Sequence, residues 1–343
     1  MTTNAKITWI DDDDDHVDIT KNLHDKEPQL KIEFILADKK LSTRVEKCLK
    51  MATKRGPDLF LIDDKLPMHG FNRRGLSVGM QVRERLPEVP IYLFSAYRHG
   101  AGVFTTLAQA ADRFADDVLD LDTVQTKGHK ILYHDALDYR RIRNSDRKSV
   151  NTLFGLMAAP LCDQDSILDA FPINLRKGLA PRKTPKGHTG NSIEFGMWIR
   201  KTFLEFPGFV YDSLYSATKL GMTHKAFLHI SLKFDPARYR GVFYESRDNR
   251  WWNSSLRELV VSTAKQRADD TTSNVQKLTQ KVFKLRNTDI AKCVVCGEKY
   301  PDTVGLYKYD VNERKPVHFR CSVRHPWIPS LLHFDQIRQF DRR

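Results

Sequence analysis

Acidic and hydroxyl side chains follow three short apolar runs in the first third of the chain. Asp11 and Asp12 follow the run KITWI, Asp63 follows LFLI, and Ser95 follows IYLF. In an open parallel sheet, ligands bind beyond the carboxyl ends of the strands, where such residues would meet. Gathered carboxylates repel one another unless a hard divalent cation neutralises them, and Mg²⁺ prefers oxygen ligands. A carboxylate beside Mg²⁺ can attack a phosphoryl group and form an aspartyl phosphate.

A hydroxyl and an ammonium near that carboxylate would hold the phosphoryl oxygens. Ser95 supplies the hydroxyl, and Lys127 supplies the ammonium if it ends a fifth strand. Leu121 competes for the same place, and the ammonium is lost if Leu121 occupies it. The alternative for residues 11–15 is a solvated acidic turn. The acid and the hydroxyl at the following strand ends favour a site over that alternative.

The elements that would position these residues alternate apolar runs with amphipathic stretches, as a parallel α/β sheet requires. We expect strands at Lys6–Ile10, Lys31–Leu36, Leu59–Ile62, Ile91–Phe94 and Thr123–Thr126. We expect helices at residues 15–23, 42–52, 75–86, 103–119 and 129–142. The predicted fold class is α/β, with an N-terminal doubly wound five-stranded parallel sheet.

These motifs resemble, in their order, the CheY-like receiver domain of bacterial response regulators over about residues 5–142. Residues 57–67 (PDLFLIDDKLP) look like the third strand of that family, with the acceptor aspartate at its end. Residues 7–12 (ITWIDD) resemble its first strand, and residues 90–96 (PIYLFSA) resemble its fourth. The aromatic switch residue that is usual on the fifth strand is absent.

The resemblance implies roles for individual residues. Asp63 would accept the phosphoryl group, Asp11 and Asp12 would bind Mg²⁺ together with Asp63, and Ser95 would be the switch residue. A histidine kinase or another phosphodonor would be the partner. A degenerate receiver that only docks a partner is the alternative.

Three of the five cysteines lie near the end of the chain in a second pattern with chemical potential. Cys293 and Cys296 form a C-x2-C-G turn, and His318 and Cys321 follow after 21 residues, with His325 as a rival ligand. This spacing indicates a closed, tetrahedral structural Zn²⁺ site. It looks like a zinc-ribbon or treble-clef finger. Unrelated cysteines and surface histidines are the alternative.

The positive charge of the protein is concentrated in its second part. Residues 1–150 contain 25 Lys and Arg against 24 Asp and Glu, whereas residues 151–343 contain 31 against 19. Basic residues cluster at 176–186 and 238–240, and aromatic residues are interleaved at 234–252. Basic side chains neutralise phosphates and aromatic rings stack on bases, so nucleic acid is a natural partner. An acidic protein partner, or a solvated linker at 176–186, is the alternative.

Residues 214–230 could form a helix-turn-helix, with Gly221 at the turn and residues 223–230 as the recognition helix. The alternative is an ordinary pair of packed helices. Trp251 and Trp252 are expected to pack in a core. Further helices are expected at residues 192–206, 210–220, 254–267 and 272–286.

The expected organisation has four parts. They are a receiver-like domain (1–145), a connecting segment (146–191), a mainly helical basic domain (192–288) and a zinc-binding α+β module (289–343). No apolar run approaches the roughly 18 residues that span a bilayer, and the acidic N-terminus is no secretory signal, so a cytoplasmic protein without membrane partners is expected.

The predicted function is that of a response-regulator-like signalling protein. Phosphorylation of Asp63 would control a basic, zinc-containing output region that binds nucleic acid. A receiver-fold adaptor that docks a kinase or effector without binding DNA is the alternative. An enzyme such as a nuclease is a third alternative, although no catalytic motif stands out in residues 150–290.

Overall fold

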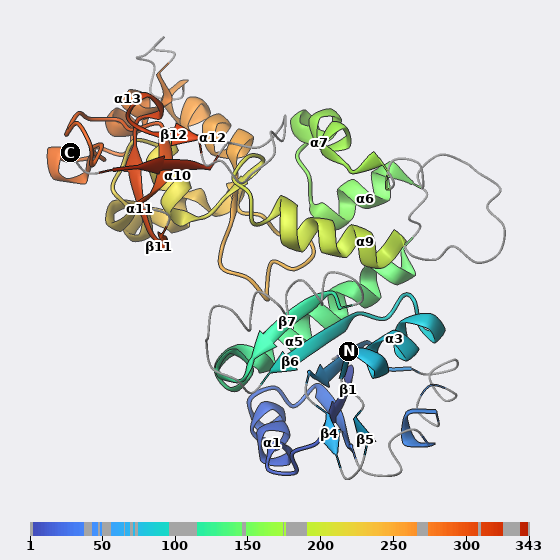
Figure 1. Cartoon of the computed structure of the whole chain (residues 1–343). Coiled ribbons are helices and arrows are strands. Elements are labelled where there is room, and N and C mark those ends of the chain that lie inside the picture. The colour runs from blue at the N-terminus through green and yellow to red at the C-terminus, as the bar shows by residue number, and fades with distance from the viewer. Residues whose placement is uncertain are drawn as a thin grey trace. The chain divides into compact units, whose positions relative to one another are not determined.

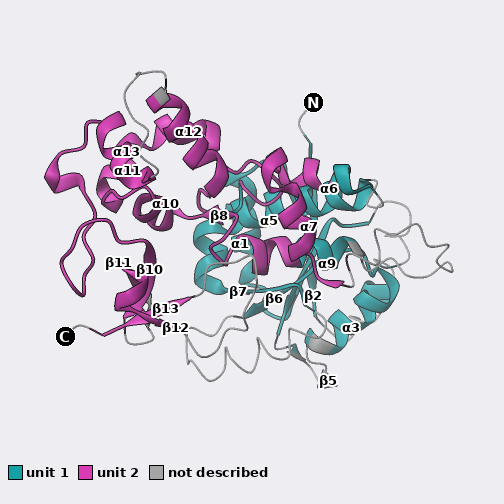
Figure 2. Cartoon of the chain, turned by 90° about the horizontal axis from the view of Figure 1, so that it is seen from above, with its two compact units in different colours: residues 1–152, 177–197, 245–247 teal, residues 153–176, 198–244, 248–343 magenta. Residues whose placement is uncertain are grey.

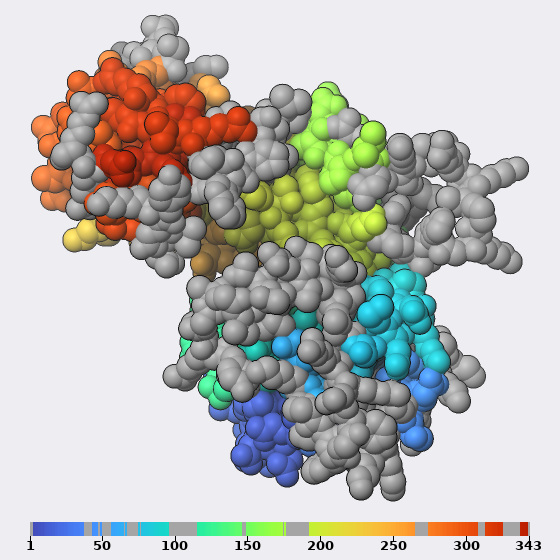
Figure 3. All heavy atoms as spheres, viewed as in Figure 1, coloured from blue at the N-terminus to red at the C-terminus, as the bar shows by residue number. Residues whose placement is uncertain are grey.

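The computed structural model describes most of the chain, and the described residues are drawn in colour in Figures 1 and 3. They are residues 3–37, 43–46, 49, 56–64, 66–68, 71–72, 75–95, 115–145, 149–173, 175, 191–265, 274–307, 310–324 and 337–341. The chain forms two compact units (Figure 2). Unit 1 comprises residues 1–152, 177–197 and 245–247, and unit 2 comprises residues 153–176, 198–244 and 248–343.

Unit 1 is built on a five-stranded sheet with the order β2-β1-β3-β6-β7, in which every neighbouring pair is parallel. Its strands are β1 (Ala5–Asp11), β2 (Leu30–Leu36), β3 (Leu59–Asp63), β6 (Ile91–Ser95) and β7 (Asp117–Asp120). This order reverses direction between β1 and β3, which makes their carboxyl ends the expected ligand site. The predicted doubly wound α/β fold class and the first four predicted strands are confirmed.

The described helices of unit 1 that pack on the sheet include α1 (His16–Lys26), α3 (Gly75–Arg85) and α5 (Leu121–Asn144). Helix α1 contacts β2 and α5, and α5 contacts β1 and β7, whereas α3 contacts β3 and β6. Alternate strand residues such as Phe60 and Ile62 pack with Val78 and Val82 of α3 in one buried cluster. The continuous apolar strands suit a sheet that is covered on both faces. A small hairpin joins β4 (Pro67–Met68) to β5 (Phe71–Asn72).

The predicted fifth strand is wrong. Residues 123–126 lie in α5, and the fifth strand is β7, which comprises Asp117–Asp120. The predicted helix over 103–119 therefore ends in strand, and its residues 103–114 lie outside the described residues. Of the predicted helix over 42–52, residues 43–46 and 49 are described and are helical.

Unit 2 contains a helical core followed by a small sheet. Its elements before the sheet include α7 (Gln164–Ala170), β8 (Val210–Tyr211), α10 (Ser213–Lys219), α11 (His224–Ile230), β9 (Trp251–Trp252), α12 (Asn253–Lys265) and α13 (Val275–Val282). Short 3-10 turns lie at residues 161–163, 231–237, 287–289 and 319–321, and a π-helical turn lies at residues 199–203. Helices α6 (Val150–Met157) and α9 (Asn191–Trp198) span the boundaries between the units.

The helical core of unit 2 is rich in aromatic side chains. Phe227 stacks on Phe234 and meets Trp251 edge-on, with ring centroids 5.3 Å and 4.9 Å apart. Trp251 and Trp252 are each 3% exposed, which confirms that they pack in a core. Each of the four helices predicted between residues 192 and 286 overlaps a described helix, and residues 210–211 are strand instead of helix. Residues 266–267 and 272–273 of these predictions lie outside the described residues.

The C-terminal sheet has the order β11-β10-β13-β12. Its strands are β10 (Thr303–Tyr307), β11 (Asp310–Val317), β12 (Val323–Arg324) and β13 (Arg338–Phe340). Val317 of β11 and Phe340 of β13 are buried in one cluster with Cys293, so the sheet and the cysteine turn share one core. Within the described residues, no helix is both long and apolar enough to cross a membrane.

Candidate functional site

Three carboxylates meet at the carboxyl edge of the unit 1 sheet. Asp11 and Asp12 lie at the end of β1, and Asp63 ends the neighbouring β3. One carboxylate oxygen from each of the three lies within 4.8 Å of the others. Asp11 and Asp63 are buried and Asp12 is partly buried. Water therefore screens the three negative charges poorly, and the carboxylates repel one another strongly. This donor set, made of hard oxygens, suits Mg²⁺.

Hydrogen bonds from neighbouring groups hold the carboxylate of Asp11 in place. Trp9 Nε1–H donates to Asp11 Oδ2 at 2.8 Å, His16 Nδ1 lies 2.9 Å from the same oxygen, and Asp13 N–H donates to Oδ1 at 3.0 Å. Trp9 and His16 stack on each other, and both rings meet Phe94 edge-on. Because Asp11 is fully buried, these bonds offset the cost of its desolvation.

The electrostatics of the cluster follow from burial and mutual proximity. Burial raises the pKa of Asp12, neighbouring Asp11 raises it further, and a hydrogen bond with Asp63 opposes the rise. The hydrogen bond to Asp11 raises the pKa of His16 above its ordinary value, against the effect of burial. The raised pKa values of Asp12 and His16 both reflect the negative charge gathered at this edge, and a divalent cation would relieve that repulsion.

Ser95 lies where the sequence predicts it. It ends β6, one residue beyond Phe94, which pairs with Asp63 in the parallel register. The side chain is buried. The sheet thus brings the hydroxyl to the strand end that neighbours the acids.

Lys127 does not lie at a strand end, so the premise of its assignment is wrong. It is an exposed residue within α5. The strand that follows β6 pairs Ser95 with Asp120, and Leu121 is the next residue. Asp120 ends this strand and Leu121 is the first residue of α5, so neither of the two expected positions places a lysine at this strand end. An ammonium from this strand end is missing.

Gly75, the first residue of α3, allows the chain to pass close to the site. Its backbone N–H donates to Asp64 O at 3.1 Å. A Cβ atom at this position would lie 1.8 Å from Asp63 O. Only a residue without a side chain fits there. Sequence reasoning missed Gly75, Trp9 and His16; the five-residue spacing from Asp11 to His16 was the one available signal.

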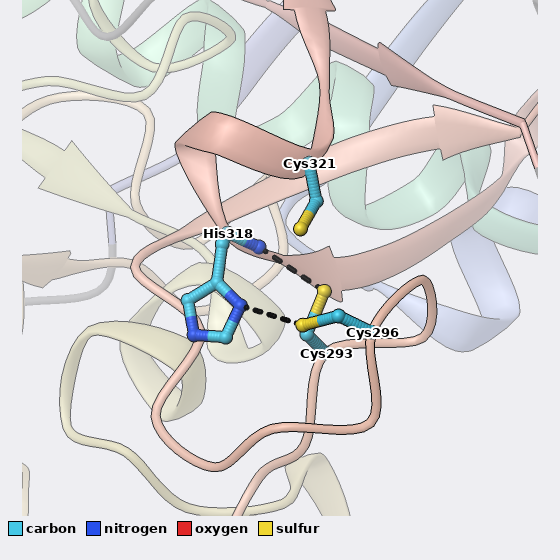
Figure 4. Close-up of side chains that lie close together, drawn as sticks. All are labelled: Cys293, Cys296, His318 and Cys321. Carbon is cyan, nitrogen blue, oxygen red and sulfur yellow. Dashed lines mark hydrogen bonds between the residues drawn. The ribbon is translucent and has the colours of Figure 1, made fainter.

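A second cluster lies in unit 2, where Cys293, Cys296, His318 and Cys321 face one another (Figure 4). One ligand atom from each lies within 4.8 Å of the others. The two cysteines of the turn precede β10, and His318 and Cys321 follow β11 in a 3-10 turn. Gly297 closes the cysteine turn with a φ of +74°, a conformation that glycine adopts without strain. The rival ligand His325 lies outside the described residues.

The hydrogen bonds around His318 determine which nitrogen faces the cluster. Nε2 lies 3.3 Å from Lys299 O, and a carbonyl oxygen only accepts, so Nε2 carries the proton. Nδ1 then presents its lone pair 3.3 Å from Cys296 Sγ. Protein zinc ligands commonly have such a carbonyl partner on the second nitrogen. The cluster has the donors and the orientation that a tetrahedral Zn²⁺ site requires.

The thiols of this cluster differ in their protonation. Burial alone would raise the pKa of Cys293, but backbone N–H groups of Cys296, His318 and Val295 donate to its sulfur and the pKa falls to about 7. Burial and the adjacent thiols of Cys296 and Cys293 raise the pKa of Cys321 to about 11. Crowded sulfurs of this kind share protons when no cation is present and release them to a metal.

Of the two predicted basic segments, the structure describes residues 238–240 and not residues 176–186. Arg240 forms an ion pair with Asp235 at 2.5 Å, and Arg238 lies 3.6 Å from the same carboxylate. These two arginines are therefore partly neutralised within unit 2.

Comparison with known proteins yields structural neighbours only. No protein-family model and no curated protein matches the sequence. Solved structures that the chain resembles include a two-component response regulator of the LuxR family from Aurantimonas sp. SI85-9A1, with 16% identity over 38% of this chain and 83% of that chain and a TM-score of 0.30.

Two further neighbours are receiver domains. The receiver domain of NtrX from Brucella abortus is 24% identical over 34% of this chain and 84% of its own length, with a TM-score of 0.26. A CheY-like receiver domain protein from Methanospirillum hungatei JF-1 is 17% identical over 40% of this chain and 98% of its own, with a TM-score of 0.28.

Proposed function

We propose that the protein is a response-regulator-like signalling protein in which unit 1 accepts a phosphoryl group on Asp63. The observation that carries this proposal is the meeting of Asp11, Asp12 and Asp63 at the carboxyl edge of a β2-β1-β3-β6-β7 sheet. Mg²⁺ held by the three carboxylates would neutralise the incoming phosphoryl oxygens, and Ser95 would donate to one of them. A histidine kinase or small phosphodonor in the cytoplasm is the proposed source.

Incubation of the whole protein with acetyl phosphate and Mg²⁺ tests this proposal. We expect the mass to rise by one phosphoryl group and the label to disappear in Asp63→Asn. Asp14→Asn is the matched control, because Asp14 is an exposed acid of the adjacent turn outside the cluster of three. If wild type is not labelled, or if Asp63→Asn is labelled as well, Asp63 is not the acceptor.

We further propose that Zn²⁺ at Cys293, Cys296, His318 and Cys321 is structural. Four protein donors fill a tetrahedral shell and leave no position for a reactive water. Zinc would connect the cysteine turn to the 3-10 turn after β11 and so stabilise the C-terminal sheet. Metal analysis should find one Zn²⁺ per chain in wild type and in Cys162→Ser, a control at an exposed cysteine outside the cluster. Cys293→Ser should lose the metal, and its retention would exclude this site.

Unit 2 is proposed to bind nucleic acid as the output of the protein. The support is the excess of basic residues in unit 2, whose residues 153–176, 198–244 and 248–343 contain 26 Lys and Arg against 17 Asp and Glu. Binding of a labelled duplex by the whole protein, measured by fluorescence anisotropy, should weaken steeply with salt because bound phosphates release counterions. Absence of binding at low salt would contradict this output.

The second candidate is an adaptor whose receiver fold docks a kinase or effector. Asp120 favours it, since a receiver whose strand after β6 ends in an acid instead of a lysine has lost one phosphoryl contact. The two candidates differ in a simple measurement. An adaptor would form the same protein complex with and without acetyl phosphate, whereas a phosphorylated switch would change its affinity.

A further inference from the structure

We infer that a groove on unit 2, between α11 and the segment that follows α13, binds the sugar–phosphate backbone of duplex DNA. The inference deepens the proposed nucleic-acid function and rests on it. The groove has a volume of about 880 Å³. Its α11 wall includes Lys225, His229 and Ile230, and its other wall is formed by residues 283–286, 288 and 289.

The charges of the groove match an anionic polymer. Lys225 and His229 are exposed on one wall, and Lys284 and Arg286 are exposed on the other. The acid of the groove, Asp289, is already paired, with Arg286 Nε 3.0 Å from its Oδ2. Accordingly, the hydrogen bond from Arg286 lowers the pKa of Asp289. Cations thus remain on both sides of a channel whose acid is neutralised, which suits phosphates.

The backbone at Lys284 is a second and independent observation. Lys284 follows the end of α13 with a φ of +52°, in the left-handed region where glycine is favoured. Its N–H donates to Lys281 O, and Leu285 N–H donates to Gln280 O, as in a glycine-ended helix. A lysine in this place costs backbone strain that glycine would avoid. We infer that lysine occupies this strained position because its ammonium has a function.

Helix α11 is presented in the way that a DNA-reading helix requires. Helix α10 packs into the core of unit 2, and a short turn with Gly221 at φ +76° leads to α11. Thr223 caps α11 by accepting from Ala226 N–H. Leu228 of α11 is 52% exposed, and Leu232, in the 3-10 turn that follows the helix, is 86% exposed.

Exposed leucines beside lysines favour duplex DNA as the ligand over an isolated phosphate ion, which offers no apolar contact. In the major groove, thymine methyl groups offer apolar contacts to such side chains, while flanking cations contact the backbone. We therefore place the outer face of α11 in the major groove and the cations of both walls, including Lys225 and Lys284, on adjacent phosphates.

The test measures binding of a fluorescein-labelled duplex to the whole protein at several KCl concentrations. Lys284→Gly and Lys225→Gln should each weaken binding roughly 3–10-fold near physiological salt and reduce the slope of log K against log salt by about one. Lys277→Gln is the control, because Lys277 is an exposed lysine of α13 that does not line the groove, and it should bind as wild type does. Lys284→Gly should also unfold at a temperature no lower than wild type, since it relieves strain.

The outcomes are separable. If wild type binds the duplex and neither groove variant differs from Lys277→Gln, the groove is not the binding site, although the proposed output stands. If wild type does not bind the duplex at low salt, the output and the groove assignment both fail. If a poly-glutamate peptide binds instead of the duplex and the groove variants abolish that binding, the groove takes an acidic protein and the DNA assignment is overturned.

Discussion

Asp11 is the residue around which the acid cluster of unit 1 is organised. Its side chain is fully buried, and it reaches the cluster already oriented by the indole of Trp9, the imidazole of His16 and the N–H of Asp13. Hydrogen-bond partners of this kind fix the orientation of a metal ligand and tune its basicity. They also bring a fluorescent side chain into contact with the carboxylate that we propose as a Mg²⁺ ligand.

Mg²⁺ is expected to change the fluorescence of Trp9. The indole N–H donates to Asp11, so charge neutralisation at that carboxylate alters the field on the ring. Trp9 is the one tryptophan among the first 152 residues. Titration of the protein with MgCl₂ should give a saturable change in emission that is absent in Trp9→Phe. A change that persists in Trp9→Phe would place the metal elsewhere.

Gly75→Ala is expected to destabilise unit 1. The new methyl group would overlap Asp63 O, and relieving such overpacking typically costs about 1–3 kcal/mol. Gly155→Ala is the matched control, because Gly155 lies exposed in α6 with no atom within 4 Å of its added Cβ. That variant should gain about 0.5–1 kcal/mol, since alanine favours a helix. Urea unfolding measures both, and equal effects would contradict the close approach at Gly75.

At the scale of elements, Asp58 joins α5 to the start of β3. Arg140 Nε donates to Asp58 Oδ1 at 2.7 Å, Arg143 lies 3.4 Å from the same oxygen, and Lys6 N–H donates to Oδ2. The Asp58 side chain is 5% exposed, so its charge is almost fully desolvated. The pair therefore holds the helix at the end of the sheet opposite the acid cluster.

Asp58→Asn should lower the free energy of unfolding of unit 1 by about 3 kcal/mol, as expected when one member of a buried ion pair is removed. Asp18→Asn is the control. Asp18 pairs with Lys21 on the exposed surface of α1, and such pairs contribute about 0–1 kcal/mol. Urea unfolding of both variants gives the comparison. Similar losses would mean that burial does not decide the strength of these pairs.

Stability of unit 2 should depend on pH through Asp163. Burial raises the pKa of Asp163, against a hydrogen bond from Ser254. The folded pKa then exceeds the unfolded one, so the favourable contribution exists below the unfolded pKa and is lost as pH rises through the folded value. Asp163→Asn should therefore stabilise unit 2 at pH 7, and the gain should shrink as the solution is acidified. A thermal unfolding series that shows no such convergence would contradict this.

The elements that could be predicted from the sequence are those with strong apolar runs. Strands β1, β2, β3 and β6 could be predicted from their apolar runs, as could the acids at the ends of β1 and β3. The edge strand β7 could not be predicted, because its residues DVLD contain two acids and only two apolar side chains. Residues 123–126 (TVQT) have the β-branched composition of a strand. However, Asp120 accepts from Thr123 N–H and starts α5, and this capping bond decides in favour of helix.

The contacts around each site were less predictable than the ligands. The acids and cysteines could be named because their residue types and spacing specify chemistry. The indole and imidazole that hold Asp11 could not be identified in the same way, since a buried tryptophan and a histidine after an acidic run are usually packing and surface residues. Their roles depend on where α1 begins relative to β1.

At the scale of the whole molecule, the chain passes between the two units several times. Unit 1 includes residues 177–197 and 245–247 in addition to residues 1–152. Within unit 1, Tyr139 is 1% exposed, and a Cβ at Gly196 would lie 2.4 Å from its ring. Residues far along the sequence therefore complete the packing of unit 1.

A fragment of residues 1–152 should be less stable than unit 1 in the whole chain. It lacks Gly196 against Tyr139 and Arg247 near Asp117, whose charged atoms lie 4.0 Å apart. Hydrogen exchange of the β1 amides, compared between the fragment and the whole protein, measures the difference. A fragment of residues 1–247 should recover part of the protection. Equal protection in the 1–152 fragment would show that the later segments add nothing.

Because the chain passes between the units, the order of synthesis determines when each unit can be completed. The last residues of unit 1, 245–247, leave the ribosome long after its fifth strand has been made. At a translation rate of about 5–20 residues per second, completion of unit 1 lags behind residue 152 by roughly 5–20 s. During that interval, part of unit 2 has already been synthesised, so neither unit is finished before the other begins.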